Sequence, residues 1–105
     1  MKTIADKDDF TSVLSTADGR VVAVMFTATW CNPCSIVLPK YKDLERDHPN
    51  AIFTIVDVDV AEDLAVDNEV AGLPTVQFFK DGQKIHEVIG HNVDKLVSAF
   101  RTYAP

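Results

Sequence analysis

The chain has 105 residues, 47% hydrophobic and 25% charged, which suits one globular domain spanning residues 1–105. Asp and Glu number 16 against 10 Lys and Arg, a net charge of −6, and no basic run occurs. We therefore expect neither nucleic acid nor a membrane as a partner. Acidic residues stand where a signal peptide would have its apolar stretch, which makes a cytoplasmic location the expectation.

The N-terminal part of the sequence predicts one helix and one buried strand. Apolar residues at positions 10, 13, 14 and 17 have the spacing of an amphipathic helix over residues 8–17, beginning near Asp6 or Asp8. Residues 21–26 are apolar throughout and rich in β-branched side chains, which is typical of a parallel strand covered on both faces. Thr3-Ile4 is an additional candidate strand.

The middle of the chain predicts two more helices around a second buried strand. Residues 34–48 have a helical apolar pattern, with Pro39 predicting a kink inside it. Residues 52–58 read as a buried strand, and residues 60–70 as a short helix.

The C-terminal part predicts a hairpin and a final helix. Residues 75–79 and 84–89 are extended runs separated by Asp81-Gly82, a strong turn signal, so the second run should return antiparallel to the first. A last helix should begin at Asn92 and include Phe100. The whole order predicts an α/β fold: a central mixed β-sheet flanked by helices on both faces, with an antiparallel edge strand.

The two cysteines, Cys31 and Cys34, stand between a buried strand and a helix. As a purely structural disulfide the pair would close a very short loop and contribute only about 2 kcal/mol. A closed zinc site needs four ligands, and the other candidates are three histidines, two of them distant in sequence: His48, His86 and His91. We therefore expect no metal site, and the Cys-x-x-Cys spacing in an α/β chain favours redox chemistry.

Each position of this motif has a chemical reason. A cysteine at a helix N-terminus faces free N–H groups and the positive end of the helix dipole, which lowers a thiol pKa from about 8.5 towards neutrality. Pro33 suits the first helical turn and stiffens the loop. Cys31 should therefore be the exposed attacking thiol and Cys34 the resolving thiol. Trp30 lies in the uncharged loop after a strand, where α/β proteins bind ligands, so we expect it in the site.

Other residues have simpler readings. Asp57 and Asp59 are expected to cap the helix that follows them. Phe78 and Phe79 are expected to pack against the sheet. His91 reads first as a surface histidine.

Short motifs along essentially the whole chain follow the order and spacing of a known family. They are Ala28-Thr29-Trp30-Cys31-Asn32-Pro33-Cys34, Pro39, Val56-Asp57-Val58-Asp59, Leu73-Pro74-Thr75, Phe78-Phe79-Lys80-Asp81-Gly82 and Gly90. With these motifs the chain resembles the thioredoxin family, most closely its small single-domain cytosolic type.

The resemblance implies a thioredoxin-like fold and a protein-disulfide reductase that cycles between a dithiol and a Cys31–Cys34 disulfide, with no bound cofactor. It also implies a peptide groove beside the active-site loop of Trp30, Asn32 and Pro33. In that groove Trp30 shields the site, and Pro74 is a cis proline that leaves the backbone of Leu73 free to pair with substrate. The remaining groove residues are Gly90 and His91.

The resemblance further implies roles in electron transport and cell redox homeostasis. The expected partners are disulfide-containing proteins and an NADPH-dependent thioredoxin reductase, and the expected state is a monomer. The alternative is a peptide-binding or scaffold module that keeps the groove but has little redox turnover.

Four positions depart from the family pattern. Asn32 replaces the usual glycine, and Ser35 replaces a basic residue. Met25 stands where the family places a buried acid that exchanges a proton with the resolving thiol, and Ile55 replaces its charged neighbour. Because buried unpaired charges are costly, the two apolar residues should favour stability over efficient proton transfer.

Overall fold

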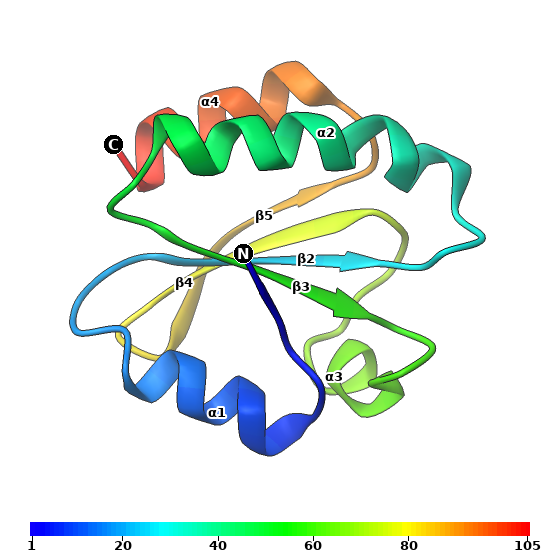
Figure 1. The fold of residues 1–105 in the computed structure, drawn as a ribbon, viewed down its shortest axis with the longest axis horizontal. Coiled ribbons are helices and arrows are strands. Elements are labelled where there is room, and N and C mark those ends of the chain that lie inside the picture. Colours follow the sequence, from blue (N-terminus) through cyan, green and yellow to red (C-terminus); the bar gives the residue numbers. More distant parts are fainter.

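The computed structural model describes residues 1–105 as a sheet with helices on both sides (Figure 1). Helices α2 and α4 cover one face of the sheet, and α1 and α3 lie on the other. The strands are β1 (Lys2–Thr3), β2 (Val22–Thr27), β3 (Ile52–Asp57), β4 (Thr75–Lys80) and β5 (Gln83–Ile89). The helices are α1 (Lys7–Ser15), α2 (Asn32–Asp47), α3 (Glu62–Asp67) and α4 (Val93–Tyr103).

The five strands follow the order β1-β3-β2-β4-β5. Strands β1 and β2 run parallel to β3, whereas β4 is antiparallel to β2 and β5 is antiparallel to β4. The predicted mixed sheet with an antiparallel edge strand is therefore confirmed. Residues Asp81 and Gly82 of the predicted turn both have positive φ, as a tight hairpin requires.

Side-chain caps fix where two of the helices begin. Asp6 accepts the N–H of Asp9 at the start of α1, and Asn92 accepts the N–H of Lys95 at the start of α4. Helix α2 begins at Asn32, two residues before its predicted start, and continues through Pro39. The first strand is Lys2–Thr3, one residue earlier than predicted.

Helix α3 is shorter than the predicted 60–70 and has no side-chain cap at Ala61. The prediction that Asp57 and Asp59 cap it is wrong. The Asp57 carboxylate instead accepts the N–H of Asp59 at 2.9 Å, within the turn before the helix. The Asp57 carboxylate thus binds a backbone N–H only two residues away, and this local bond replaces a cap on the helix.

Two apolar clusters fill the space between the sheet and its helices. On the α2–α4 side the rings of Phe53 and Phe78 each lie 4.8 Å from that of Phe100. On the α1–α3 side the ring of Phe79 meets that of Phe10 edge-on at 5.5 Å. Phe78 and Phe79 thus pack on opposite faces of β4, which confirms their predicted role.

No helix of the protein combines the length and apolar character needed to cross a bilayer.

Arg20 joins the loop before β2 to the loop before β3. Its Nε donates to the carbonyl oxygen of Asn50 at 2.7 Å, and its Nη2 reaches those of Pro49 and Ala51 at 3.4 and 3.5 Å. We expect Arg20→Ala to lower the free energy of unfolding by about 1–2 kcal/mol, because carbonyls of one loop lose a charged donor. Urea denaturation measures this, and Arg20→Lys should recover only part of the loss because lysine lacks the planar fork. An unchanged denaturation midpoint for Arg20→Ala would show that the bonds contribute nothing.

Candidate functional site

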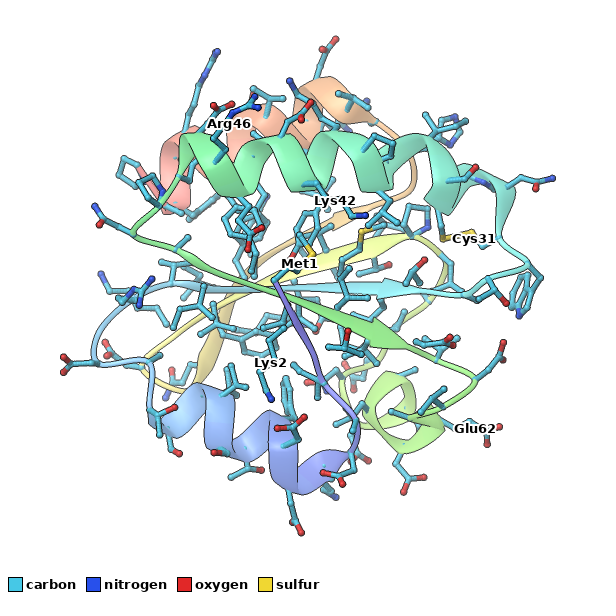
Figure 2. The ribbon with its side chains drawn as sticks, in the orientation of Figure 1. Met1, Lys2, Cys31, Lys42, Arg46 and Glu62 are labelled. Atoms are coloured by element: carbon cyan, nitrogen blue, oxygen red, sulfur yellow. A yellow bond between two sulfur atoms is a disulfide. The ribbon has the colours of Figure 1, made fainter.

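The two cysteines meet where β2 passes into α2. Cys31 is the N-cap residue of α2, with extended backbone angles of φ −87° and ψ 105°, and Pro33 occupies the first turn. The Sγ of Cys31 accepts the N–H of Cys34 at 3.3 Å. The two residues form a disulfide, with their Cα atoms 5.3 Å apart. Figure 2 shows Cys31 at the start of α2, on the side of the molecule where β2 and β3 end.

The two sulfurs differ in access. Cys31 retains 8% of its surface exposed, whereas Cys34, one turn into the helix, retains 2%. Cys31 is thus the more accessible of the pair, although most of its surface is covered in the disulfide form.

The interior beneath the disulfide is apolar. Met25 is fully buried in the same cluster as both cysteines, and its register partners on the neighbouring strands are Ile55 and Val76. No Asp, Glu, Lys, Arg or His is buried anywhere in the protein. Charge on the buried sulfur therefore gains nothing from an interior ionic partner.

Tyr41 is the buried titratable group of this cluster. Its hydroxyl donates to the carbonyl oxygen of Thr54 at 2.8 Å. Burial raises the pKa of Tyr41 well above its ordinary value, and the bond to Thr54 opposes that shift only in part. Tyr41 is consequently a neutral hydrogen-bond donor at physiological pH and not a base for the thiols.

Trp30 directly precedes Cys31 and is 66% exposed. Its indole N–H donates to the carboxylate of Asp59 at 2.8 Å, and the Asp59 N–H is held in turn by Asp57. The turn after β3 thus orients Trp30. Sequence reasoning gave Asp59 a capping role and missed this bond. An exposed tryptophan needing an acceptor for its N–H was the available signal.

The opposite wall comes from the segment before β4. A hollow of about 510 Å³ is lined by six residues: Trp30, Cys31, Asn32, Pro33, Gly72 and Leu73. The Leu73–Pro74 peptide bond is cis, as the resemblance implied, and Pro74 itself is buried. Gly72 was not among the residues predicted from the sequence, because a lone glycine before Leu73 carries no chemical signature.

The other two predicted groove residues lie beside a second hollow. Gly90 and His91 line this hollow of about 540 Å³ together with Ile89. The Gly90 N–H donates to the carbonyl oxygen of Pro74 at 2.8 Å, which ties the end of β5 to the segment that carries Leu73. A Cβ on Gly72 would lie 3.9 Å from Cγ2 of Ile89, so one residue of each hollow lies next to one of the other. No group of three or more His, Cys, Asp or Glu side chains is placed to hold a metal ion.

Known proteins share both the sequence and this architecture. The family model for thioredoxin matches residues 2–102. Thioredoxin of Mus musculus is 41% identical over 104 residues, 99% of each chain, and that of Ophiophagus hannah is 37% identical over 103 residues, 98% of each chain. The structure is similar to the X-ray structure of Fasciola hepatica thioredoxin, with a TM-score of 0.95, 33% identity, and coverage of 98% of this chain and 99% of that one.

Proposed function

This chain belongs to the thioredoxin family and is a thiol–disulfide oxidoreductase that reduces protein disulfides, and we propose that Cys31 is its nucleophile and Cys34 its resolving thiol. The observation that carries this assignment is the N-cap position of Cys31, whose Sγ accepts the N–H of Cys34. In the reduced protein the same N–H and the helix dipole favour the thiolate of Cys31. The smaller exposure of Cys34 supports the second role.

The reaction needs no atoms beyond the two thiols, the substrate disulfide and solvent protons. The Cys31 thiolate attacks one substrate sulfur, forms a mixed disulfide and releases the other substrate sulfur as a thiolate. Cys34, after its thiol proton has left, attacks Cys31 and forms the Cys31–Cys34 disulfide. The second substrate thiolate leaves at this step. The substrate has then gained two electrons, and its two sulfurs become thiols by taking protons.

We assign substrate binding to the hollow beside Cys31 and to the neighbouring hollow at the end of β5. Asn32 and Pro33 shape the loop at the cysteines, and the hollow opposite offers backbone for an extended peptide to pair with. The residues proposed to contact substrate are Trp30, Leu73, Pro74, Gly90 and His91.

The family gives the kinds of partner: disulfide-containing proteins as substrates and a thioredoxin reductase that restores the dithiol. We propose further that this reductase uses NADPH, and that residues 1–105 act as one domain and a monomer without a bound cofactor. Both cysteines of the chain belong to the redox pair. The absence of any further cysteine for a structural disulfide fits the cytoplasm, where thiols stay reduced. In that compartment the protein would act in electron transport and redox homeostasis.

A disulfide-reduction assay tests the proposal. With dithiothreitol as the electron donor, the wild-type protein should reduce insulin disulfides in many turnovers. Cys31→Ser should reduce the rate to that of dithiothreitol alone, because no nucleophile remains. Binding of a disulfide protein without turnover by the wild type would favour the peptide-binding or scaffold module instead.

The hollow beside Cys31 can be tested by filling it. Gly72→Leu would add a large side chain to the lining of this hollow, so we expect kcat/KM for insulin to fall about tenfold, a loss of about 1.4 kcal/mol of transition-state stabilisation. Gly72→Ala is the matched control, because its Cβ would make only an ordinary contact with Ile89. Equal kcat/KM values for the leucine variant and the wild type would exclude this hollow as the binding groove.

A further inference from the structure

The net charge of the chain is confined to one short segment. Residues 57–69 contain six carboxylates and no Lys or Arg, whereas the rest of the chain has ten acidic residues balanced by ten Lys and Arg. The segment covers the end of β3, the following turn and α3. Asp67, bound to Lys7 at 3.0 Å, is the one carboxylate among the six that forms an ion pair. This segment therefore carries the whole net charge of −6.

This charged segment adjoins the redox site and carries exposed apolar side chains. Asp59 accepts the indole N–H of Trp30, which lines the hollow beside Cys31. Val60 is 70% exposed and Val66 is 75% exposed, unusually open for large apolar residues that no neighbouring element covers. Figure 2 shows Cys31 and Glu62 towards the same end of the molecule.

The carboxylates and the valines form one surface. Asp59, Val60, Glu62 and Asp63 line a common hollow of about 280 Å³, and Asp6 and Lys7 of the α1 end complete its charged lining. Lys7 is paired with Asp67, so the other carboxylates keep no cationic partner. Val66 lies four residues after Glu62 and three after Asp63 in α3, so helical spacing places the three side chains on one face. We name these five residues the α3 surface: Asp59, Val60, Glu62, Asp63 and Val66.

We propose that the α3 surface docks protein substrates that carry Lys or Arg, next to an apolar side chain, beside the disulfide to be reduced. The proposal rests on the function proposed above and adds a charge preference among substrates. Cationic groups complement the carboxylates, and the valines supply apolar contact that a purely charged surface would lack. Because the rest of the chain has no net charge, attraction turns a basic partner towards the Trp30 side of the site and raises the rate of productive encounter.

The test compares two protein substrates with the same disulfide, one flanked by lysines and the other by glutamates. We expect kcat/KM to be about tenfold or more higher for the lysine-flanked substrate at about 10 mM ionic strength, within the range of electrostatic steering. Raising the ionic strength to about 300 mM should bring the ratio near one, because exposed charges are then screened within several ångströms. A ratio near one at low salt would overturn the proposal.

Two double variants with the same change in net charge locate the effect. Glu62→Gln/Asp63→Asn should lower the lysine-to-glutamate ratio about threefold or more, since each exposed pair contributes modestly. Asp43→Asn/Asp47→Asn should retain the wild-type ratio, because these residues flank Arg46 in the half of α2 away from Cys31 (Figure 2). Equal effects of the two variants would assign the preference to net charge alone and contradict the proposed surface.

Circular dichroism establishes that each variant is folded. If the Glu62→Gln/Asp63→Asn variant unfolds, the single variants Glu62→Gln and Asp63→Asn replace it, each compared with Asp43→Asn, and a loss of the ratio confined to the α3 variants supports the proposal. Failure of the wild type to reduce either substrate would count against the proposed catalytic roles, whereas reduction of both substrates at equal rates would count against the α3 surface only.

Discussion

Cys34→Ser will accumulate covalent mixed disulfides with substrate proteins, whereas Cys31→Ser will accumulate almost none. The first variant keeps the N-cap thiol that attacks the substrate but has no second thiol to release it. The second keeps only a thiol that is 2% exposed and has no route to a protein disulfide. We expect at least a tenfold difference in trapped protein.

Non-reducing gel electrophoresis of purified variants mixed with a disulfide protein measures the trapped fraction. Addition of dithiothreitol should release the substrate and so verify that the link is a disulfide. The Cys31→Ser/Cys34→Ser double variant gives the background. Trapping of equal size in both single variants would contradict the assignment of different roles to the two thiols.

Met25→Asp has the second large expected effect, and it acts on both stability and kinetics. Met25 is fully buried beneath the disulfide among apolar side chains. An aspartate there would lose its hydration without gaining an ionic partner, because the register partners are Ile55 and Val76. We expect the free energy of unfolding to fall by about 1–3 kcal/mol or more.

The same substitution should speed the release of the mixed disulfide near neutral pH. Cys34 must lose its proton before it attacks Cys31, and its apolar surroundings disfavour the thiolate. In the natural protein, release should therefore become faster as the pH rises. A carboxylate at position 25 would supply a proton acceptor and weaken that pH dependence.

Urea denaturation measures the stability change, and stopped-flow kinetics from about pH 6 to 9 measure the release step. Met25→Leu is the control, since it conserves volume without adding a polar group and should cost less than about 1.5 kcal/mol. If release in the natural protein is already fast and independent of pH, and Met25→Asp leaves it unchanged, then the apolar residue has no consequence for the mechanism.

Much of the site could be predicted from the sequence because its chemistry is local. Cys31, Asn32, Pro33 and Cys34 are consecutive, and an N-terminal helical turn brings the two sulfurs together whatever surrounds them. The residues on the far side of the groove could not be predicted from the spacing of residues in the sequence. Leu73 is distant in sequence from Cys31, and only the resemblance to a family suggested that they meet.

The sequence by itself determined the buried strands, the cap at Asn92 and the Asp81-Gly82 hairpin, and it narrowed the start of α1 to Asp6 or Asp8, of which the structure shows Asp6. Each depends on periodicity or on side-chain bonds between residues close in the chain.

The tertiary structure alone decided that β4 runs antiparallel to β2 and that Asp59 binds Trp30, 29 residues away, instead of capping α3. It also decided that Gly72 lines the hollow with Cys31. These outcomes depend on contacts between segments that are distant in the chain. Such contacts form only when the sheet assembles, and their packing energy then outweighs local preferences.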